Sequence, residues 1–399
     1  MGYETYRIAD LIDEIAMGPF GSNIKVSCFV DSGVPVLNGS NLEGFSLSEK
    51  TFRYVTREKA DSLNKANAHR GDIVITHRGT LGQIVFIPQD SKYDRYVISQ
   101  SQFRVRCNDK VLPEYLVYYF HTPIGQHKLL SNASQVGVPA LARPSSTFQQ
   151  IEVVLPELSI QKRVVEIIST IQKKIVNNQE LNDNLYEMVN AYYTSLFKEN
   201  DCEMTTVGNY AERIYSGGTP MTSNAAYWNG TFGWFSSGET RNRFVISTEK
   251  TITQAGIDNS STKLATKYDI VMASAGQGFT RGQTSMLLID TYVNQSVIVI
   301  KSERNILPYL FWNLANRYDE LRAISDSSSI RGSLTTKMIA AFEIPLAKAQ
   351  SLQAFADFAW SVIHQIENNL LENERLTALR DSLLPKLMSG EIDVSDIQL

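Results

Sequence analysis

The residues best suited to chemistry lie in glycine-rich loops that also carry basic and hydroxyl side chains. These loops are GPFGSNIK (Gly18–Lys25), THRGTLGQ (Thr76–Gln83), SGGTPMTSNAAYW (Ser216–Trp228), SSGETRNR (Ser236–Arg243) and ASAGQGFTR (Ala273–Arg281). Glycine lets the backbone approach a phosphate, while hydroxyl and guanidinium groups donate hydrogen bonds to it. Arg, Asn and Gln side chains match the edges of guanine and adenine in the major groove. Together the loops predict a surface for duplex DNA, although each loop alone also fits a structural turn.

The side chains of these loops form a set of candidate DNA contacts. Two later loops, 134–137 and 329–332, are also expected to line the groove. Lys25, Arg78 and Arg281 are the leading candidates for phosphate or base contacts. The full set is Ser22, Asn23, Lys25, His77, Arg78, Thr80, Gln135, Gly218, Thr219, Arg241, Ser274, Gln277, Arg281 and Arg331.

Signatures of catalysis are missing from the sequence. There is no GxxxxGK[ST] phosphate loop, and GQGFTRG (Gly276–Gly282) departs from a dinucleotide-binding pattern because its third glycine comes one place late. The Asn/Asp-Pro-Pro-aromatic signature of an amino-methyltransferase is absent, and the five histidines show no metal-ligand spacing. We therefore predict no catalytic residue, no metal site and no cofactor bound by this chain.

Composition bounds the class of protein. The 399 residues are enough for two to four domains, and 43% hydrophobic with 20% charged residues is typical of a well-packed protein. No apolar run is long enough to span a bilayer, and Met1–Asp10 lacks the apolar stretch of a signal peptide. The three cysteines are scattered, which favours reduced thiols in the cytoplasm.

The net charge of −4 is unevenly distributed. Residues 50–110 hold 12 Lys/Arg against 6 Asp/Glu, an excess of six positive charges, whereas the chain after Asp357 is rich in Glu and Asp. A basic stretch in the first domain and an acidic C-terminal helix are compatible with DNA binding in one region and protein contact in another.

The elements that position the loops occur twice in the sequence. An apolar run, a proline and a glutamine precede a long helical pattern at VVLPELSIQKRVVEII (Val153–Ile168) and again at FEIPLAKAQSLQAFADF (Phe342–Phe358). Upstream, RGDIVITHRGTLGQIVFIP (Arg70–Pro88) matches KYDIVMASAGQGFTRGQTSMLLI (Lys267–Ile289), and YVISQSQFRV (Tyr96–Val105) matches YVNQSVIVI (Tyr292–Ile300). This long-period repeat predicts a duplicated module with a bent mixed sheet and polar loops.

Each copy ends in a helical pattern of about 40 residues with one apolar stripe, which at the helical rise gives a rod of roughly 60 Å. The simplest partner for one stripe is the other, in an antiparallel coiled coil that would place the modules at opposite ends like the jaws of a caliper. Asn178 and Asn373 interrupt the stripes at similar places and either set the register or face water. Pro385 predicts a kink in the second helix, and Gly390 predicts its end.

The chain resembles the specificity subunit of a Type I restriction–modification system along nearly all its length. GPFGSNIK and SGGTPMTSNAAYW resemble the openings of that family's target-recognition domains, and GDIVITHRGTLGQI (Gly71–Ile84) resembles their central segment. The ending LRDSLLPKLMSGEIDV (Leu379–Val394) is the most specific mark. The second copy departs from the pattern, with ASAGQGFTRG in place of THRGTLGQ, which puts individual contacts in doubt.

The resemblance implies an α+β fold with two target-recognition domains joined by two long helices, with approximate two-fold symmetry. The expected divisions are recognition domains at 1–156 and 200–346, a central helix at 157–199 and a C-terminal helix at 347–399. Each domain would read one half of a split, asymmetric DNA site. The subunit would do no chemistry itself and would dock two modification subunits that use S-adenosylmethionine to methylate adenine. Restriction subunits using ATP and magnesium would complete the assembly.

Two other functions stay open from the residues alone. The chain could be a coiled-coil scaffold without DNA recognition, or a stand-alone DNA-modifying enzyme. Binding of S-adenosylmethionine by the isolated chain would favour the enzyme. Sequence-specific DNA complexes above a non-specific background would exclude the scaffold.

Overall fold

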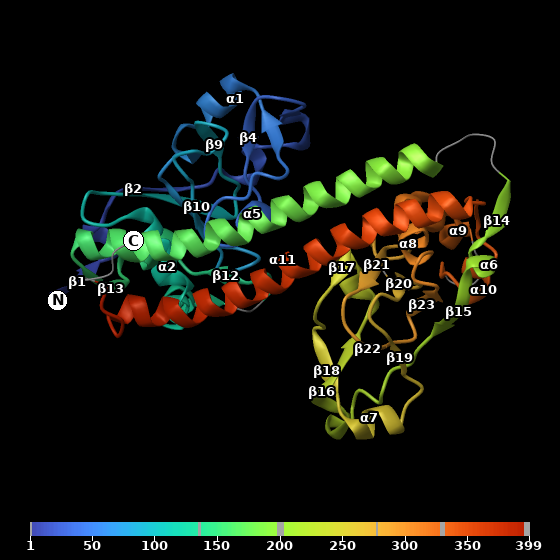
Figure 1. The fold of residues 1–399 in the computed structure, drawn as a ribbon. Helices are drawn as coiled ribbons and strands as arrows, with labels where there is room; N and C mark the ends of the chain where they lie inside the picture. The colour runs from blue at the N-terminus through green and yellow to red at the C-terminus, as the bar shows by residue number, and fades with distance from the viewer. Residues whose placement is uncertain (1, 135–136, 198–202, 277, 328–331, 395–399) are drawn as a thin grey trace. The chain divides into compact units, whose positions relative to one another are not determined.

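The computed structural model of the chain (Figure 1) describes residues 2–134, 137–197, 203–276, 278–327 and 332–394. Its internal contacts divide it into two compact units. Unit 1 comprises Met1–Lys173 and Leu376–Leu399, and unit 2 comprises Lys174–Arg375. Unit 1 is therefore built from both ends of the chain, whereas unit 2 is one continuous segment.

Unit 1 is organised around two β-sheets. Its strands are Tyr3–Arg7 (β1), Ile12–Met17 (β2), Phe29–Val30 (β3), Val34–Val36 (β4), Arg53–Val55 (β5), Asn67–His69 (β6), Ile73–Thr76 (β7), Ile84–Phe86 (β8), Arg95–Val97 (β9), Gln102–Cys107 (β10), Ala133–Ser134 (β11), Ala140–Leu141 (β12) and Glu152–Pro156 (β13). One sheet has the order β2-β10-β7-β8, with every pair antiparallel. The other has the order β3-β5-β4-β9-β6, in which β4 pairs parallel with β9. The pairs β1–β13 and β11–β12 stand apart.

Short helices cover the sheets of unit 1. They are Arg57–Ser62 (α1), Pro113–His121 (α2), Pro123–Leu130 (α3) and Pro144–Gln149 (α4). Three of them begin with proline, whose fixed φ suits the first helical position and whose missing N–H has no partner there anyway. The residues from Tyr115 to Phe120 in α2 are all buried, and they pack in one core with Ile73 and Ile75 of β7.

Unit 2 repeats this plan. Its strands are Met204–Thr206 (β14), Ala211–Ser216 (β15), Trp228–Phe235 (β16), Phe244–Val245 (β17), Lys250–Ile252 (β18), Lys263–Ala265 (β19), Ile270–Ala273 (β20), Thr284–Leu287 (β21), Thr291–Val293 (β22), Val297–Ser302 (β23) and Glu343–Pro345 (β24). The sheet orders are β15-β23-β20-β21-β17 and β18-β16-β22-β19, and β14 pairs with β24. The parallel pair β16–β22 corresponds to β4–β9. The duplication predicted from the sequence is thus a duplication of topology.

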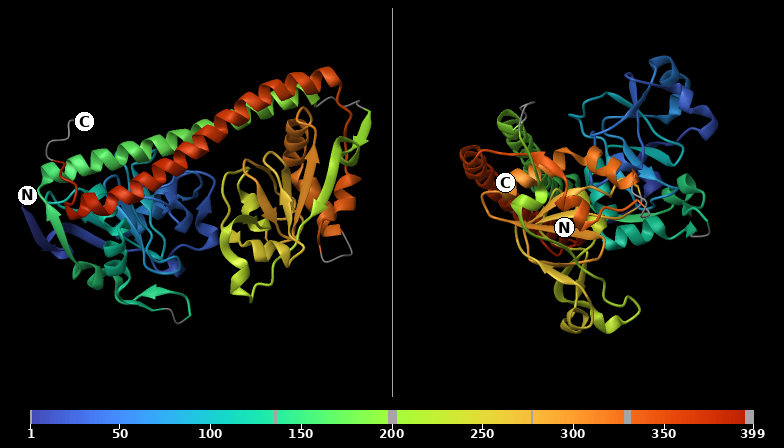
Figure 2. Two further views of the ribbon diagram at one scale, coloured as in Figure 1. Left: turned by 60° about the horizontal axis from the view of Figure 1, so that its bottom comes forward. Right: turned by 90° about the vertical axis from the view of Figure 1, so that its right-hand side faces the viewer.

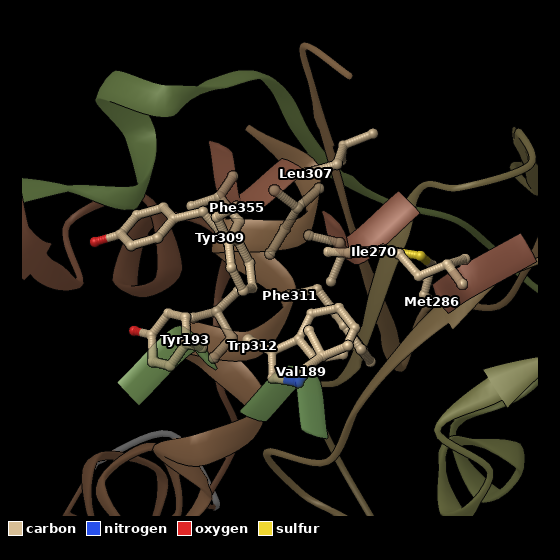
Figure 3. Close-up of a cluster of buried hydrophobic side chains, with 14 of the residues drawn as sticks. Val189, Tyr193, Ile270, Met286, Leu307, Tyr309, Phe311, Trp312 and Phe355 are labelled. Carbon is tan, nitrogen blue, oxygen red and sulfur yellow. The ribbon is translucent and has the colours of Figure 1, made fainter. Parts of the chain in front are cut away.

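The core of unit 2 is rich in aromatic residues (Figure 3). Its short helices are Val207–Tyr210 (α6), Gln254–Asp258 (α7), Leu307–Asn316 (α8), Tyr318–Ser327 (α9) and Thr336–Ala340 (α10). Trp312 of α8 is fully buried, stacks on Tyr186 with ring centroids 5.5 Å apart, and meets Phe355 edge-on at 5.9 Å. The same cluster includes Ile270 and Met286 from the sheet, so α8 joins the sheet to the long helices.

Two long helices, Leu158–Phe197 (α5) and Ala349–Ser389 (α11), contribute to both units (Figures 1 and 2). In unit 1 the start of α5 packs with the end of α11, and in unit 2 the end of α5 packs with the start of α11. The pair is therefore antiparallel, as predicted. No described helix, these two included, has a stretch both long and apolar enough to cross a membrane. Gly390, with φ of +75°, ends α11 as predicted.

The two asparagines that interrupt the apolar stripes meet in unit 2. Asn178 is 3% exposed and Asn373 is 8% exposed, and Nδ2 of Asn178 donates to Oδ1 of Asn373 at 2.8 Å. A second pair follows one turn away, where Nδ2 of Asn369 donates to Oδ1 of Asn182 at 2.7 Å. The water-facing interpretation of Asn178 and Asn373 is therefore wrong. A buried amide pair fixes which residues of the two helices stand opposite each other.

Candidate nucleic-acid interface

In unit 1 the candidate DNA contacts lie on loops at one end of the sheet strands β2, β10 and β7. We call residues 18–28, 77–83, 98–101 and 137–142 the unit 1 platform. Backbone hydrogen bonds join its loops: Gly18 N donates to Gln102 O at 2.8 Å, His77 N to Ser101 O at 2.8 Å, and Leu141 N to His77 O at 2.9 Å. The platform is thus one hydrogen-bonded layer.

Unit 2 carries the matching layer. We call residues 217–227, 274–276, 278–283, 294–296 and 332–334 the unit 2 platform. Ser274 stands where His77 stands in unit 1, because its N donates to Ser296 O at 2.9 Å and its carbonyl accepts from Leu334 N at 2.9 Å. Gly218 N donates to Val293 O at 3.1 Å, at the end of β22, whereas Gly18 bonds to the start of β10. The central loops of the two units therefore meet their neighbours through corresponding backbone groups, whereas the first loops bond to different strands.

Glycine is required where each first loop leaves its strand. A Cβ added to Gly18 would lie 1.8 Å from the carbonyl oxygen of Ser99, and one added to Gly217 would lie 1.9 Å from that of Val293. Any side chain at these positions would push the loop off the neighbouring backbone. The glycines of GPFG and SGGTP thus set the position of the loops that follow.

The predicted contacts of unit 1 are largely accessible. Lys25, Arg78 and Thr80 are exposed, and neither cation forms an ion pair with any residue that the structure describes. Asn23 is exposed in the 3-10 turn Gly21–Asn23, which also holds the backbone of Ser22. Two cations with free guanidinium and ammonium groups on a glycine-rich layer suit phosphate binding.

His77 differs from its exposed neighbours. Its ring is half-buried and its Nε2 lies 3.1 Å from the carbonyl oxygen of Gln100. Burial, together with the nearby charge of Arg78, lowers the pKa of His77, against the opposing effect of the hydrogen bond. The neutral ring with its proton on Nε2 donates to the carbonyl, so His77 adds no positive charge at neutral pH.

In unit 2 most predicted contacts already have partners within the chain. Arg281 donates to the carbonyl of Gly332 and pairs with Asp326 at 2.6 Å. Arg241 is exposed and pairs with Glu249. Both guanidinium groups must exchange or share these partners to bind a phosphate.

The remaining predicted contacts of unit 2 hold the loops in place. Thr219 Oγ1 bonds to the side-chain oxygen of Gln295. Gly218 and Ser274 are buried, and the Gly218 carbonyl accepts from Trp234 Nε1 at 3.3 Å. For every one of these residues, contact with DNA stays a prediction.

Three predicted contacts, Gln135, Gln277 and Arg331, lie outside the described residues. Their neighbours show where their loops attach. The stretch after Gln135 returns to the unit 1 platform at Leu141, and the stretch after Arg331 returns to the unit 2 platform at Leu334. Within the described residues no three His, Cys, Asp or Glu side chains come together as a possible metal site.

Known proteins match the chain over both units. A family model described as the Type I restriction modification DNA specificity domain matches residues 2–187 and, a second time, residues 201–378. The chain belongs to this family. The repeated match follows the repeated topology, and it favours DNA recognition over the scaffold and stand-alone enzyme hypotheses.

Individual relatives agree with the family. The chain is 27% identical to the specificity subunit of the Type I restriction enzyme EcoR124I/EcoR124II from Escherichia coli, over 63% of either chain, so that this alignment spans less than two thirds of the relative. It is 21% identical to the HindI specificity subunit from Haemophilus influenzae, over 81% of this chain and 87% of the relative. The crystal structure of a Type-I restriction-modification system S subunit from M. genitalium shares the fold, with a TM-score of 0.60 and 16% identity over 97% of this chain and 96% of that one.

The sequence-based predictions for this member of the family did not include a short repeat inside the platforms. Pro19-Phe20-Gly21-Ser22-Asn23 and Pro220-Met221-Thr222-Ser223-Asn224 share the pattern P-Φ-x-S-N, where Φ is a large apolar residue. Aligning the two loops on their prolines, with two extra residues in the second loop, would have shown it. The apolar member is strongly exposed in both, at 82% for Phe20 and 64% for Met221.

Proposed function

We propose that this specificity subunit reads a split, asymmetric duplex DNA site, with one half-site bound by each platform. The observation that carries the proposal is the construction of the same hydrogen-bonded loop layer twice, with different side chains on the two copies. Matching layers give two modules the same way of seating on a duplex. Different side chains give them different base preferences.

The chain supplies recognition, and the proposal assigns the chemistry to partners. Two modification subunits would bind S-adenosylmethionine and methylate adenine, and restriction subunits would use ATP and magnesium. The acidic C-terminal helix offers a surface for such partners. We place the assembly in the cytoplasm, where its DNA is found. The division into domains at 1–156, 157–199, 200–346 and 347–399 belongs to the same proposal.

The primary experiment is a map of adenine methylation. The chain is expressed with its modification subunits in a host that lacks other methyltransferases, and the host DNA is sequenced for methylated adenine. We expect one bipartite motif with two unlike halves. Methylation without a shared motif, or a motif with identical halves, would contradict the proposal.

Binding then separates specific from non-specific contacts. On the mapped duplex, Arg78→Ala is expected to weaken binding and to lower the slope of log affinity against log salt by about one, because one phosphate contact is lost. The matched control is Arg7→Ala, since Arg7 lies on β1 away from the platforms and pairs with Glu152. Equal slopes for the two variants would remove Arg78 from the interface.

We also propose that the paired helices set the gap between the half-sites. Two continuous helices of 40 and 41 residues, joined by two asparagine pairs of which one is buried, support this. Deleting residues 171–177 together with 374–380 removes about two turns from each and keeps the apolar stripes close to phase. Seven residues rise about 10 Å, so the gap is expected to shorten by about three base pairs. An unchanged gap would refute this role.

A further inference from the structure

The P-Φ-x-S-N repeat places one apolar side chain at the same point of each platform. Phe20 and Met221 each follow a proline, and they lie two residues beyond Gly18 and four residues beyond Gly217, the glycines that meet the neighbouring backbone. Among the described residues, Val26 and Phe279 are also strongly exposed, but neither has an equally exposed apolar counterpart in the other unit. Within the described residues of the two platforms, only the position of Phe20 and Met221 is apolar and strongly exposed in both units.

A fixed turn holds each of these side chains. The carbonyl of Phe20 accepts from the N–H of Asn23 at 2.8 Å, and the carbonyl of Met221 accepts from the N–H of Asn224 at 3.1 Å. The proline in front restricts the backbone further, because its ring fixes φ. Both apolar side chains thus stand at the first position of a four-residue hydrogen-bonded turn.

The turns rest on corresponding glutamines. A Cβ on Gly21 would lie 2.2 Å from Oε1 of Gln100, so this amide lies directly against the first turn. In unit 2, Gln295 accepts a hydrogen bond from Thr219, just before the second turn. Gln100 and Gln295 each stand one residue before the serine that bonds the central loop.

Phe and Met at these points cannot read base edges or phosphates by hydrogen bonding, because their side chains donate and accept no strong hydrogen bonds. Duplex DNA offers an apolar side chain two surfaces, the thymine methyl group and the faces of the bases. Base faces become accessible only when a step is opened. Phe and Met are among the side chains that open such steps in proteins that bend DNA.

We propose that Phe20 and Met221 are wedges, each of which inserts at one base step of its half-site and unstacks it. This inference rests on the proposed function and makes the wedge a specificity determinant. Opening a step is least costly at flexible pyrimidine–purine sequences. Each platform therefore selects its half-site partly by how readily one step deforms.

The test uses the chain assembled with its modification subunits and the duplex mapped by methylation. Single 2-aminopurine or pyrrolocytosine residues replace adenine or cytosine at successive positions, because both dyes brighten when unstacked. The methylated adenine itself is left unlabelled, because the modification subunit flips it out of the stack. At the other positions we expect with the wild type a several-fold rise at one step in each half-site. Phe20→Ala is expected to abolish one rise and keep the other, and Met221→Ala is expected to do the reverse. Each is expected to weaken binding by about tenfold.

Ile124→Ala and Leu264→Ala are matched controls, since these apolar residues are 64% and 45% exposed and lie outside the platforms. Both should leave the two rises unchanged. Circular dichroism melting shows whether each variant is folded. Phe20→Leu should keep part of its rise, since leucine can also enter a step.

Three results would overturn the wedge. The first is a wild-type complex that prefers the mapped duplex to a scrambled one but unstacks no step. The second is a pair of rises that survive both alanine variants. The third is a loss of affinity when thymine is replaced by uracil, seen in the wild type and absent in Phe20→Ala, because this assigns the side chain to a methyl group. A wild-type complex without preference for the mapped duplex would refute the proposed function itself.

Discussion

Replacing Asn178 by leucine tests the buried asparagine pair. The change removes the donor of the 2.8 Å bond to Asn373 and leaves that amide oxygen buried without a donor. An orphaned buried polar group costs about 1–3 kcal/mol, and the added apolar side chain offsets part of this. The bond from Asn178 to Glu372 adds little, because Glu372 is 44% exposed and keeps Lys174 as a partner. We expect Asn178→Leu to lower the free energy of unfolding by about 1–2 kcal/mol.

The double variant with Asn373→Leu should behave differently. When both amides are removed, neither side chain keeps a buried polar atom without a hydrogen-bond partner. Two leucines then fill the seam between the helices. Asn373 also donates to the carbonyl of Ile175 at 3.1 Å, but that carbonyl lies within α5, so its loss costs little. We expect the double variant to match or exceed the wild type, which gives a coupling free energy of about 2 kcal/mol.

Urea unfolding followed by tryptophan fluorescence measures these changes. All four tryptophans lie in unit 2, at positions 228, 234, 312 and 360, as does the asparagine pair, so the signal reports the relevant unit. Asn177→Leu is the control, because Asn177 is the exposed neighbour of Asn178. A single variant as stable as the wild type, or a double variant with the summed loss of the singles, would refute the reasoning.

The other predictions concern unit 1. Burial lowers the pKa of His121, whose Nε2 lies 2.9 Å from the carbonyl of Ile84, so the unfolded chain binds the extra proton more readily. The contribution of His121 to stability should therefore be full above about pH 6.5, and it should fall as the pH drops towards the lowered pKa of the folded state. His121→Gln should remove this part of the pH dependence of stability, measured in acid titrations followed by circular dichroism. Gln161 is 1% exposed and accepts from Leu112 N at 3.0 Å. Gln161→Ala should cost about 1–3 kcal/mol in urea unfolding, whereas Gln350→Ala should cost almost nothing, because Gln350 is exposed; equal losses would contradict this. Gly18→Ala should lower the melting temperature by at least about 4 °C, and an unchanged temperature would show that the loop can move away.

The architecture could be predicted from the sequence because its signals are local and written twice. The apolar stripes fix the long helices, and the matched apolar runs fix corresponding strands. The repeated glutamine shows the limit of this reasoning. Gln161 is buried and bonds to Leu112, but Gln350 is exposed, because a similar sequence position does not ensure similar packing.

The candidate site could be predicted only as a set of loops. Arg281 is paired with Asp326, 45 residues further along the chain, and such a pairing follows from the folded backbone rather than from local sequence. The residue types of Gly218 and Ser274 suit contact with DNA, but both residues are buried, and this burial depends on the strands beside them. The shared position of Phe20 and Met221 was not predicted, because only the polar residues of those loops have types that suit hydrogen bonding to DNA.

Unit 1 has a consequence for the order of events during synthesis. Its core joins Ile160, Val164 and Ile168 to Leu384 and Leu387, from the far end of the chain. Domains fold in turn as they leave the ribosome, at about 5–20 residues per second. The first unit to emerge must therefore wait, with an apolar helix face uncovered, while the whole of the second is translated. A chaperone could thus bind the nascent N-terminal half for longer than any other part of the chain.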